Sequence, residues 1–462
     1  MKRLLAIILA LTFIIMAFAS CTKVVEDETD SNSLADSENG SGDIAPENGT
    51  SDSENGNTAT DANGKETASN SDTEQTKPVF NGKESTSGLK FELNEDKQSY
   101  TVVGKGTSTA TSIVIDGHNG LPVTRVGYSA FAEDNTITSV KLGDYVEVIE
   151  DQGFSMCKGI TSLTFGKNVK FLGDYSFRYC NALTSVELGK NIEVIKYGAF
   201  YNCKNLATIK MYDKVRVIEE YAFDKTAYFN DSNNWKNNVL YIGTNLVKAK
   251  SDISGTYTVT AGTTCIGGLA FNGCKSLSGI SIPDSVHSIG LKAFQNATAL
   301  KNITIGNGVT YIGENAFKKT GLYNTSSSWK NNVLYVGSYL VAAKADLNGS
   351  YTVTAGTRVI SDYAFEACER VSTIVIPDSV VYIGECAFID CTKLSSVTIG
   401  SGVKEIGVYA FKDCTALKGI VLRKNDGWKA DGIAISADKV ASKEDALITL
   451  GILYSDKVWK RA

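Results

Sequence analysis

Apolar residues recur along most of the chain with a period of 23 residues, and a phenylalanine marks each period. A β-branched residue lies eight positions before each phenylalanine, and a second apolar residue lies five positions before it. A Leu-x-x-Ile-x-Ile pattern follows, and its last two members alternate as they do in a strand with one buried face. The marker residues form three runs: Phe131, Phe154, Phe177, Phe200, Phe223; Phe271, Phe294, Phe317; and Phe365, Phe388, Phe411.

A fixed period of this length predicts a solenoid, in which each repeat buries its apolar face only against its neighbours. Glycine often stands four positions before the phenylalanine and indicates a tight turn. The Ala-Phe-x-x-Cys segment has a spacing of three to four residues and predicts a single helical turn. We therefore expect mostly short β-strands with short helical turns, stacked as a rod of coils.

The two gaps between the runs each span one period plus 25 extra residues, and these inserts, at about 226–262 and 320–356, resemble each other. The segment Trp235–Gly243 recurs as Trp329–Gly337, 94 residues later. Glycine interrupts a β-rich run in both, which predicts a β-hairpin projecting from the rod. Two interpretations stay open: a binding protrusion, or a lengthened structural coil that fills a bend.

The repeat pattern, Val-x-x-Ile-Gly-x-x-Ala-Phe-x-x-Cys-x-x-Leu-x-x-Ile-x-Ile, is seen at 286–305 with Ala297 in the cysteine position. It resembles the BspA-like leucine-rich repeats of bacterial surface proteins, over about residues 121–422. The resemblance implies a leucine-rich-repeat solenoid of the α/β class. It also implies an adhesin or surface interaction protein without enzymatic activity.

The N-terminus predicts export. Lys2 and Arg3 precede an apolar run at 4–19, which suits a signal peptide over 1–20. Cys21 follows Ala19 and Ser20, as in a bacterial lipobox, so we expect it to carry the lipid. The competing interpretation is an ordinary signal peptide followed by an unmodified cysteine. A lipidated Cys21 would anchor the exported chain to the bacterial cell membrane or outer surface.

Composition divides the remaining chain. Residues 22–80 hold 14 acidic residues and three lysines, and they are too polar to build a core, so 21–87 reads as a disordered acidic tether. We expect an N-terminal β cap at 88–120, the solenoid at 121–424 and a C-terminal cap with a helix at 425–462. The chain carries −5; subtracting −11 for the tether and +2 for the signal leaves about +4. That charge is too small to indicate nucleic-acid binding.

The sequence shows no grouping of residues that is typical of a catalytic or metal site. The only histidines, His118 and His287, fall in a turn and in a charged, solvated column. We expect no enzyme activity, no cofactor and no metal site. Cys386 shares a column with tyrosines, which predicts exposure. Seven other cysteines follow the marker phenylalanine by three positions and read as buried thiols: Cys157, Cys180, Cys203, Cys274, Cys368, Cys391 and Cys414.

These features predict a surface-tethered, non-catalytic scaffold for adhesion or protein–protein interaction, whose partner is an extracellular or cell-surface protein. The alternative is an envelope lipoprotein that binds a glycan or another small ligand through the inserts. Candidate contact residues come from an outward strand column, a tyrosine column and the insert tryptophans: Lys141, Thr164, Glu187, Lys210; Tyr175, Tyr221, Tyr363, Tyr409; Trp235 and Trp329.

Overall fold

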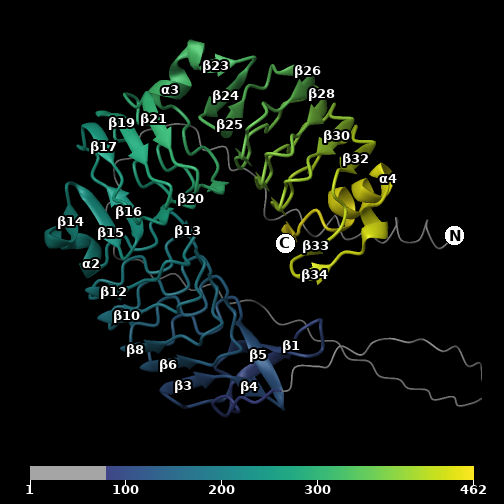
Figure 1. Cartoon of the computed structure of the whole chain (residues 1–462). Helices are drawn as coiled ribbons and strands as arrows, with labels where there is room; N and C mark the ends of the chain where they lie inside the picture. Colours follow the sequence, from purple (N-terminus) through teal and green to yellow (C-terminus); the bar gives the residue numbers. More distant parts are fainter. Residues whose placement is uncertain (1–79, 462) are drawn as a thin grey trace, which may run out of the picture. The chain divides into compact units, whose positions relative to one another are not determined.

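The computed structural model describes residues 80–461, which belong to one compact unit, Thr76–Ala462 (Figure 1). The predicted signal peptide, Cys21 and most of the acidic tether lie outside the described residues. Within the described part, no helix is long and apolar enough to cross a membrane.

Each coil contributes two strands to two parallel stacks, one of short strands and one of longer strands. The short-strand stack contains β7 (Val148–Ile149), β9 (Phe171–Leu172), β11 (Val194–Ile195), β13 (Val217–Ile218), β18 (Cys265–Ile266), β20 (Ser288–Ile289), β22 (Tyr311–Ile312), β27 (Val359–Ile360), β29 (Tyr382–Ile383) and β31 (Glu405–Ile406). The long-strand stack contains β3 (Ser112–Ile115), β6 (Ser139–Leu142), β8 (Ser162–Thr164), β10 (Ser185–Glu187), β12 (Thr208–Lys210), β17 (Gly255–Thr258), β19 (Leu277–Ile282), β21 (Asn302–Ile305), β26 (Asn348–Thr352), β28 (Arg370–Val375), β30 (Ser396–Ile399) and β32 (Gly419–Leu422).

The register of these strands confirms the predicted 23-residue solenoid. Phe171 pairs with Val148 on one side and with Val194 on the other, one period away in each direction. The marker phenylalanines stack in the core, with nearly parallel rings. Phe177, which is fully buried, lies 5.4 Å from Phe154 and 5.2 Å from Phe200 between ring centroids. Burial of these rings against neighbouring coils is the main apolar contribution to stability.

The Ala-Phe-x-x-Cys segments are not the predicted helical turns. They are successive hydrogen-bonded turns, with left-handed residues two before and two after the phenylalanine, such as Gln152 (φ 58) and Met156 (φ 60). In this conformation the N–H groups of Gln152, Phe154 and Met156 donate to carbonyls of the next coil. A helix would satisfy most of its N–H groups internally, whereas a solenoid needs them between coils.

The inserts contain the predicted hairpin and a second one. In the first insert, α2 (Ala227–Asn230) and η1 (Ser232–Asn234) precede β14 (Trp235–Lys236), β15 (Val239–Ile242) and β16 (Asn245–Ala249). The second insert repeats this order with α3 (Gly321–Asn324), η2 (Ser326–Ser328), β23 (Trp329–Lys330), β24 (Val333–Val336) and β25 (Tyr339–Ala343). Asn237 and Asn238, both left-handed, connect β14 to β15 in the manner of a two-residue hairpin turn.

The prediction that the hairpins project from the rod is wrong. Val239, Leu240 and Leu246 are fully buried, and β16 pairs in parallel with β18 of the next coil. The hairpin is apolar on both faces, so it is stable only inside the stack. Beside the short strands, the coils on either side of the insert remain connected by a backbone hydrogen bond, in which Gly268 N–H donates to Ile218 O at 2.7 Å. The insert strands thus join the sheet that contains the short strands β18, β20 and β22.

Both ends of the stack are closed by non-repeat elements. At the start, β1 (Lys90–Leu93) and β2 (Tyr100–Gly104) form a hairpin that pairs with β5 (Leu121–Val126), which β4 (Gly117–His118) also flanks. At the other end lie β33 (Trp428–Ala430), β34 (Ile433–Ala434), η3 (Ala437–Val440), α4 (Lys443–Ala446), η4 (Leu447–Leu453) and β35 (Trp459–Arg461). Ser442 caps α4 by accepting from Asp445 N at 3.1 Å, and Trp428 packs on Trp459. These caps cover core that an open coil would expose.

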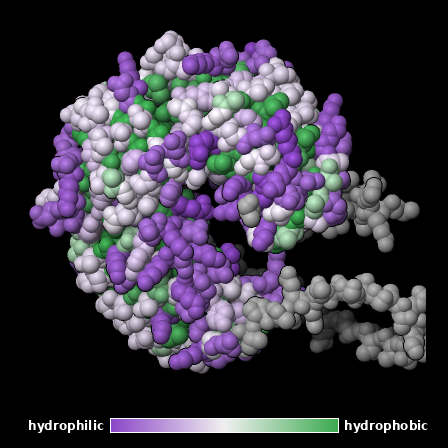
Figure 2. Space-filling model, in the orientation of Figure 1, coloured by the Kyte–Doolittle hydropathy of each residue, from purple (hydrophilic) through white to green (hydrophobic). Residues whose placement is uncertain are grey.

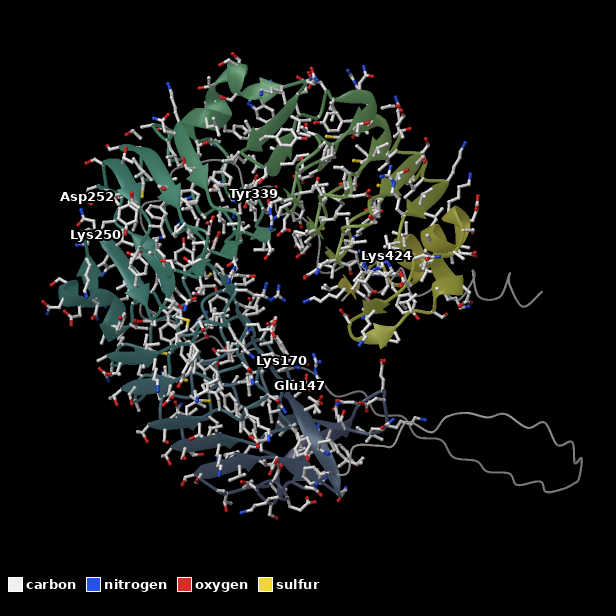
Figure 3. All side chains as sticks on the ribbon, viewed as in Figure 1. Glu147, Lys170, Lys250, Asp252, Tyr339 and Lys424 are labelled. Atoms are coloured by element: carbon white, nitrogen blue, oxygen red, sulfur yellow. The ribbon has the colours of Figure 1, made fainter. Side chains whose placement is uncertain are left out.

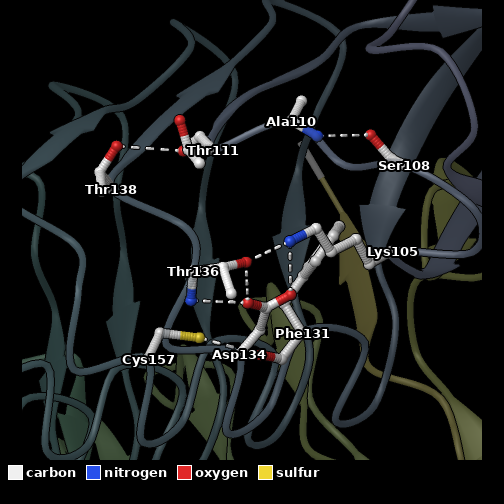
Figure 4. Close-up of polar contacts among 9 residues, drawn as sticks. All are labelled: Lys105, Ser108, Ala110, Thr111, Phe131, Asp134, Thr136, Thr138 and Cys157. Atoms are coloured by element: carbon white, nitrogen blue, oxygen red, sulfur yellow. Dashed lines mark hydrogen bonds and ion pairs between the residues drawn. The ribbon is translucent and has the colours of Figure 1, made fainter.

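The cysteine column lies against the phenylalanine ladder. Cys157 Sγ–H donates to Phe131 O of the preceding coil at 2.9 Å (Figure 4), and Cys180, Cys203, Cys391 and Cys414 repeat the contact. All nine described cysteines are buried. The exposure expected for Cys386 is therefore wrong: the backbone is left-handed there as it is at Tyr175 and Tyr221, but the cysteine side chain is too short to reach the surface and is fully buried.

These thiols should react slowly in the native chain. Burial raises the pKa of Cys157 to about 12 and that of Cys274 to about 11. At pH 8 such shifts lower the thiolate fraction, and hence the rate with Ellman's reagent, by roughly 100-fold or more. In chain 22–462 we expect slow native reaction and nine reactive thiols after unfolding in guanidinium. Fast reaction of any thiol in the folded chain would contradict this burial.

Candidate interaction surfaces

The outward strand column lies on the surface, as its alternating pattern predicts, but two of its charged side chains pair with each other. Lys141, Thr164, Glu187 and Lys210 are all exposed. Lys210 Nζ lies 2.7 Å from Glu187 Oε1, and the Tyr212 hydroxyl also donates to this carboxylate. The hydrogen bonds from Lys210 and Tyr212 lower the pKa of Glu187. In this column Glu187 and Lys210 therefore offer a partner an ion pair that is already formed.

Charged columns elsewhere on the solenoid are paired in the same way. Lys170 Nζ lies 3.1 Å from Glu147 Oε2 one coil before it (Figure 3), and Arg216 Nε lies 3.2 Å from Glu193 Oε2. On the face shown in Figure 2, hydrophobic residues are scattered among polar ones. Exposed ion pairs of this kind contribute little to stability.

The insert tryptophans are held within their own inserts. Trp235 Nε1–H donates to Phe229 O at 2.8 Å, and Lys250 Nζ lies 5.4 Å from the Trp235 ring. Trp329 repeats this arrangement with Tyr323 and Lys344. A cavity of about 110 Å³ lies beside the second insert, but Trp329 does not line it. It is smaller than the roughly 300–1,000 Å³ of small-molecule sites.

A cluster of five tyrosines forms the most aromatic part of the described surface of the first run of coils. The Tyr197 ring lies 5.1 Å from Tyr175 and 5.5 Å from Tyr221, and Tyr179 lies 6.2 Å from Tyr201. We call Tyr175, Tyr179, Tyr197, Tyr201 and Tyr221 the tyrosine face. Tyr221 is 40% exposed and the others are half-buried, so their rings present both apolar area and hydroxyl groups.

The backbone positions the tyrosine face through its left-handed turns. Tyr175 (φ 54) and Tyr221 (φ 57) occupy the position two before the phenylalanine, where Gly198 (φ 57) stands in the coil between them. A Cβ atom at Gly198 would lie 2.7 Å from the Tyr175 ring, so glycine leaves the space in which that ring lies. Burial, followed by a hydrogen bond with Tyr175, raises the pKa of Tyr197, which keeps its hydroxyl protonated at neutral pH.

Two cations lie on this face, and one of them is Lys225, whose Nζ lies 5.3 Å from the Tyr201 ring centroid. The Arg178 guanidinium lies 4.9 Å from the Tyr175 ring centroid and 4.8 Å from that of Tyr179. These distances are typical of cation–π contacts. Tyr, Trp and Arg are also the residue types most enriched in the energetic centres of protein interfaces.

The tyrosine face is only partly visible in the repeat pattern. The tyrosine column contains Tyr175 and Tyr221, whereas Tyr179, Tyr197, Tyr201 and Arg178 lie outside it. Tyr197 escaped because it lies 22 residues after Tyr175 and 24 before Tyr221, outside a strict 23-residue column. Tyr363 and Tyr409 belong to the third run of coils and are not part of the tyrosine face. A search for aromatic residues one position off register would have found Tyr197.

The repeat pattern that builds the two parallel stacks of strands matches a known family model. The model of the BspA type leucine-rich repeat region matches residues 124–254, 249–350 and 344–427, together more than half of the chain. The chain belongs to the BspA-type leucine-rich repeat family. No curated protein sequence matches it significantly.

Solved structures of bacterial leucine-rich repeat proteins are similar to this BspA-type chain. A leucine-rich cell surface protein from Faecalibacterium prausnitzii is 23% identical, with 74% of this chain and 94% of that chain covered and a TM-score of 0.25. A leucine-rich repeat protein from Bacteroides ovatus is 18% identical, with 73% and 88% covered and a TM-score of 0.26. The pneumococcal vaccine antigen PcpA is 18% identical, with 78% and 90% covered and a TM-score of 0.27.

Proposed function

We propose that this BspA-type chain is an exported, lipid-anchored surface protein whose solenoid is a non-catalytic scaffold for protein–protein interaction. The tyrosine face is its contact surface. The observation that carries the proposal is the aromatic cluster itself, which combines five tyrosines and an arginine on a hydrogen-bonded, close-packed backbone. A rigid aromatic surface loses little conformational entropy on binding.

The N-terminal segment supports the role of a surface-tethered scaffold. A signal peptide, a lipidated Cys21 and an acidic segment rich in Ser, Asn and Gly would hold the solenoid at a distance from a membrane.

Within residues 80–461, no group of three or more His, Cys, Asp or Glu residues could hold a metal ion. The tryptophans expected to bind glycan have their indole N–H groups bonded internally, which favours a protein partner over a glycan.

Loss of Tyr197 should weaken partner binding by 10-fold or more, because truncating a central interface aromatic commonly costs about 2 kcal/mol or more. Chain 22–462 would be tested by biolayer interferometry against extracellular-matrix proteins, other cells and glycans. The variants are Tyr197→Ala and, as a matched tyrosine on the third run of coils, Tyr409→Ala.

Saturable binding to a protein that Tyr197→Ala loses and Tyr409→Ala keeps would support the proposal. Equal binding by both variants would exclude the tyrosine face as the contact surface. Binding restricted to glycans would exclude the protein-interaction function. Circular dichroism and thermal unfolding of both variants would separate lost contacts from lost fold.

A further inference from the structure

Arg178 is a cation for which the structure records no acceptor in the described part of the chain. Its Nε atom is buried and makes no hydrogen bond, and no carboxylate among residues 80–461 forms an ion pair with it. Arg125, Arg216 and Arg423 instead pair with Glu150, Glu193 and Asp378. The Nε atoms of Arg358 and Arg461 are buried without an acceptor as well, so what points to a partner at Arg178 is its unpaired guanidinium between the half-buried rings of Tyr175 and Tyr179.

The acidic residues that precede neighbouring tyrosines are already engaged. Asp174 Oδ1 accepts from Tyr197 N at 3.1 Å. Glu220 Oε1 lies 3.4 Å from Lys292 Nζ of a later coil. Neither carboxylate forms an ion pair with Arg178, so the guanidinium is available to an incoming acidic group.

The tyrosines on either side fix the orientation of this cation. Tyr175 and Tyr179 hold the planar guanidinium at 4.9 and 4.8 Å from their ring centroids. Its N–H groups form a fork that matches a carboxylate, and stacking on aromatic rings lowers the entropy lost when such a bond forms. The surrounding rings would exclude water from a carboxylate bound there and strengthen the bond.

We propose that Arg178, flanked by Tyr175 and Tyr179, binds the side-chain carboxylate of an acidic peptide segment on the protein partner. The inference rests on the proposed function, because it assigns partner chemistry to the tyrosine face. Charge complementarity selects an acidic residue for the cation, and the tyrosine rings select apolar neighbours beside it. The partner segment therefore alternates acidic and apolar residues.

The test uses two immobilised peptides, Glu-Leu-Glu-Leu-Glu and its uncharged counterpart Gln-Leu-Gln-Leu-Gln, and chain 22–462 at pH 7 and low salt. We expect the Glu peptide to bind at least 10-fold more tightly than the Gln peptide. Arg178→Gln should remove that preference, and Arg178→Lys should keep part of it, because lysine retains the charge and loses the fork. The control Arg216→Gln removes a cation of the same coils that is already paired, and it should keep the full preference.

Several results would overturn the proposal. Equal binding of the two peptides, or an equal loss of preference in Arg178→Gln and Arg216→Gln, would show that Arg178 does not bind the carboxylate. The same peptides are also tested against chain 80–462, which lacks the acidic segment. A preference for the Glu peptide that appears only in chain 80–462 would mean that acidic residues of 22–79, rather than an external partner, bind Arg178 in the longer chain. If a protein partner still depends on Tyr197 while the Glu preference is absent, this inference fails and the proposed function stands.

Discussion

Replacing Phe177 by alanine should lower the free energy of unfolding by about 3–5 kcal/mol, the usual range for a fully buried phenylalanine. Phe177 stacks between Phe154 and Phe200, at 5.4 and 5.2 Å. The coils on either side are fixed by backbone hydrogen bonds such as Phe177 N–H to Ala199 O at 2.8 Å. They cannot close over the missing ring, so a cavity remains and the full cost is expressed.

Urea unfolding of chain 22–462 followed by circular dichroism measures this change. Thr164→Ala, on the exposed strand column of the same run of coils, is the control and should shift stability by less than about 0.5 kcal/mol. Phe177→Leu should fall between the two, because leucine refills part of the volume. An unfolding midpoint of Phe177→Ala close to that of Thr164→Ala would show that the ladder does not stabilise the stack.

Asp362 should make the protein less stable as the pH rises from about 5 to about 8. Its carboxyl is buried at the coil that follows the second insert, and burial, followed by the charge of Glu385, raises its pKa to about 8. Asp362 Oδ1 accepts from the Tyr382 hydroxyl at 3.1 Å and from Glu385 N–H at 2.9 Å. Near neutral pH the folded state therefore binds a proton that the unfolded state, with a pKa of 3.8, releases.

The sign follows from this difference in bound protons. Stability falls wherever the folded state binds more protons, so the contribution is fully present below pH 4 and is lost as the pH passes 8. A shift of this size corresponds to a few kcal/mol. Asp362→Asn keeps the acceptor oxygen without the ionisable group. The two proteins should differ least near pH 5, and Asp362→Asn should be more stable by a few kcal/mol near pH 9.

Thermal unfolding of both proteins between pH 5 and 9 tests this prediction. A smaller decline should persist in Asp362→Asn, because burial also raises the pKa of Glu385. The comparison variant Asp378→Asn removes an exposed carboxyl whose pKa is lowered, chiefly by the Ser401 N–H, and it should not flatten the decline above pH 6. Parallel pH profiles of stability for the wild type and Asp362→Asn would show that the proton bound in the folded state is not on Asp362.

The repeat itself was readable from the sequence because one physical constraint acts in every coil. Within each run every phenylalanine stacks on the next, so the spacing of Phe154, Phe177 and Phe200 sets both the period and the strand register. The resemblance of the full repeat to BspA-like proteins therefore pointed to the correct family. Burial of the thiol column followed from the same register, since Cys157 and its equivalents keep a constant distance from that ring.

Features that break the register were decided only by the tertiary structure. The hairpin at Leu240 and Leu246 reads as a projection in the sequence, but its two apolar faces are buried by coils on both sides. The turn around Phe177 reads as helical by spacing, whereas its N–H groups are needed by the next coil.

The tyrosine face, too, depends on contacts between coils that no single repeat specifies. Tyr175 reaches Tyr197 across Gly198, and Arg178 lies between Tyr175 and Tyr179. The sequence by itself determined the period, the family and the core column, because these depend on one coil repeated. The surface required the folded stack, because side chains meet there by direction and packing rather than by their distance along the chain.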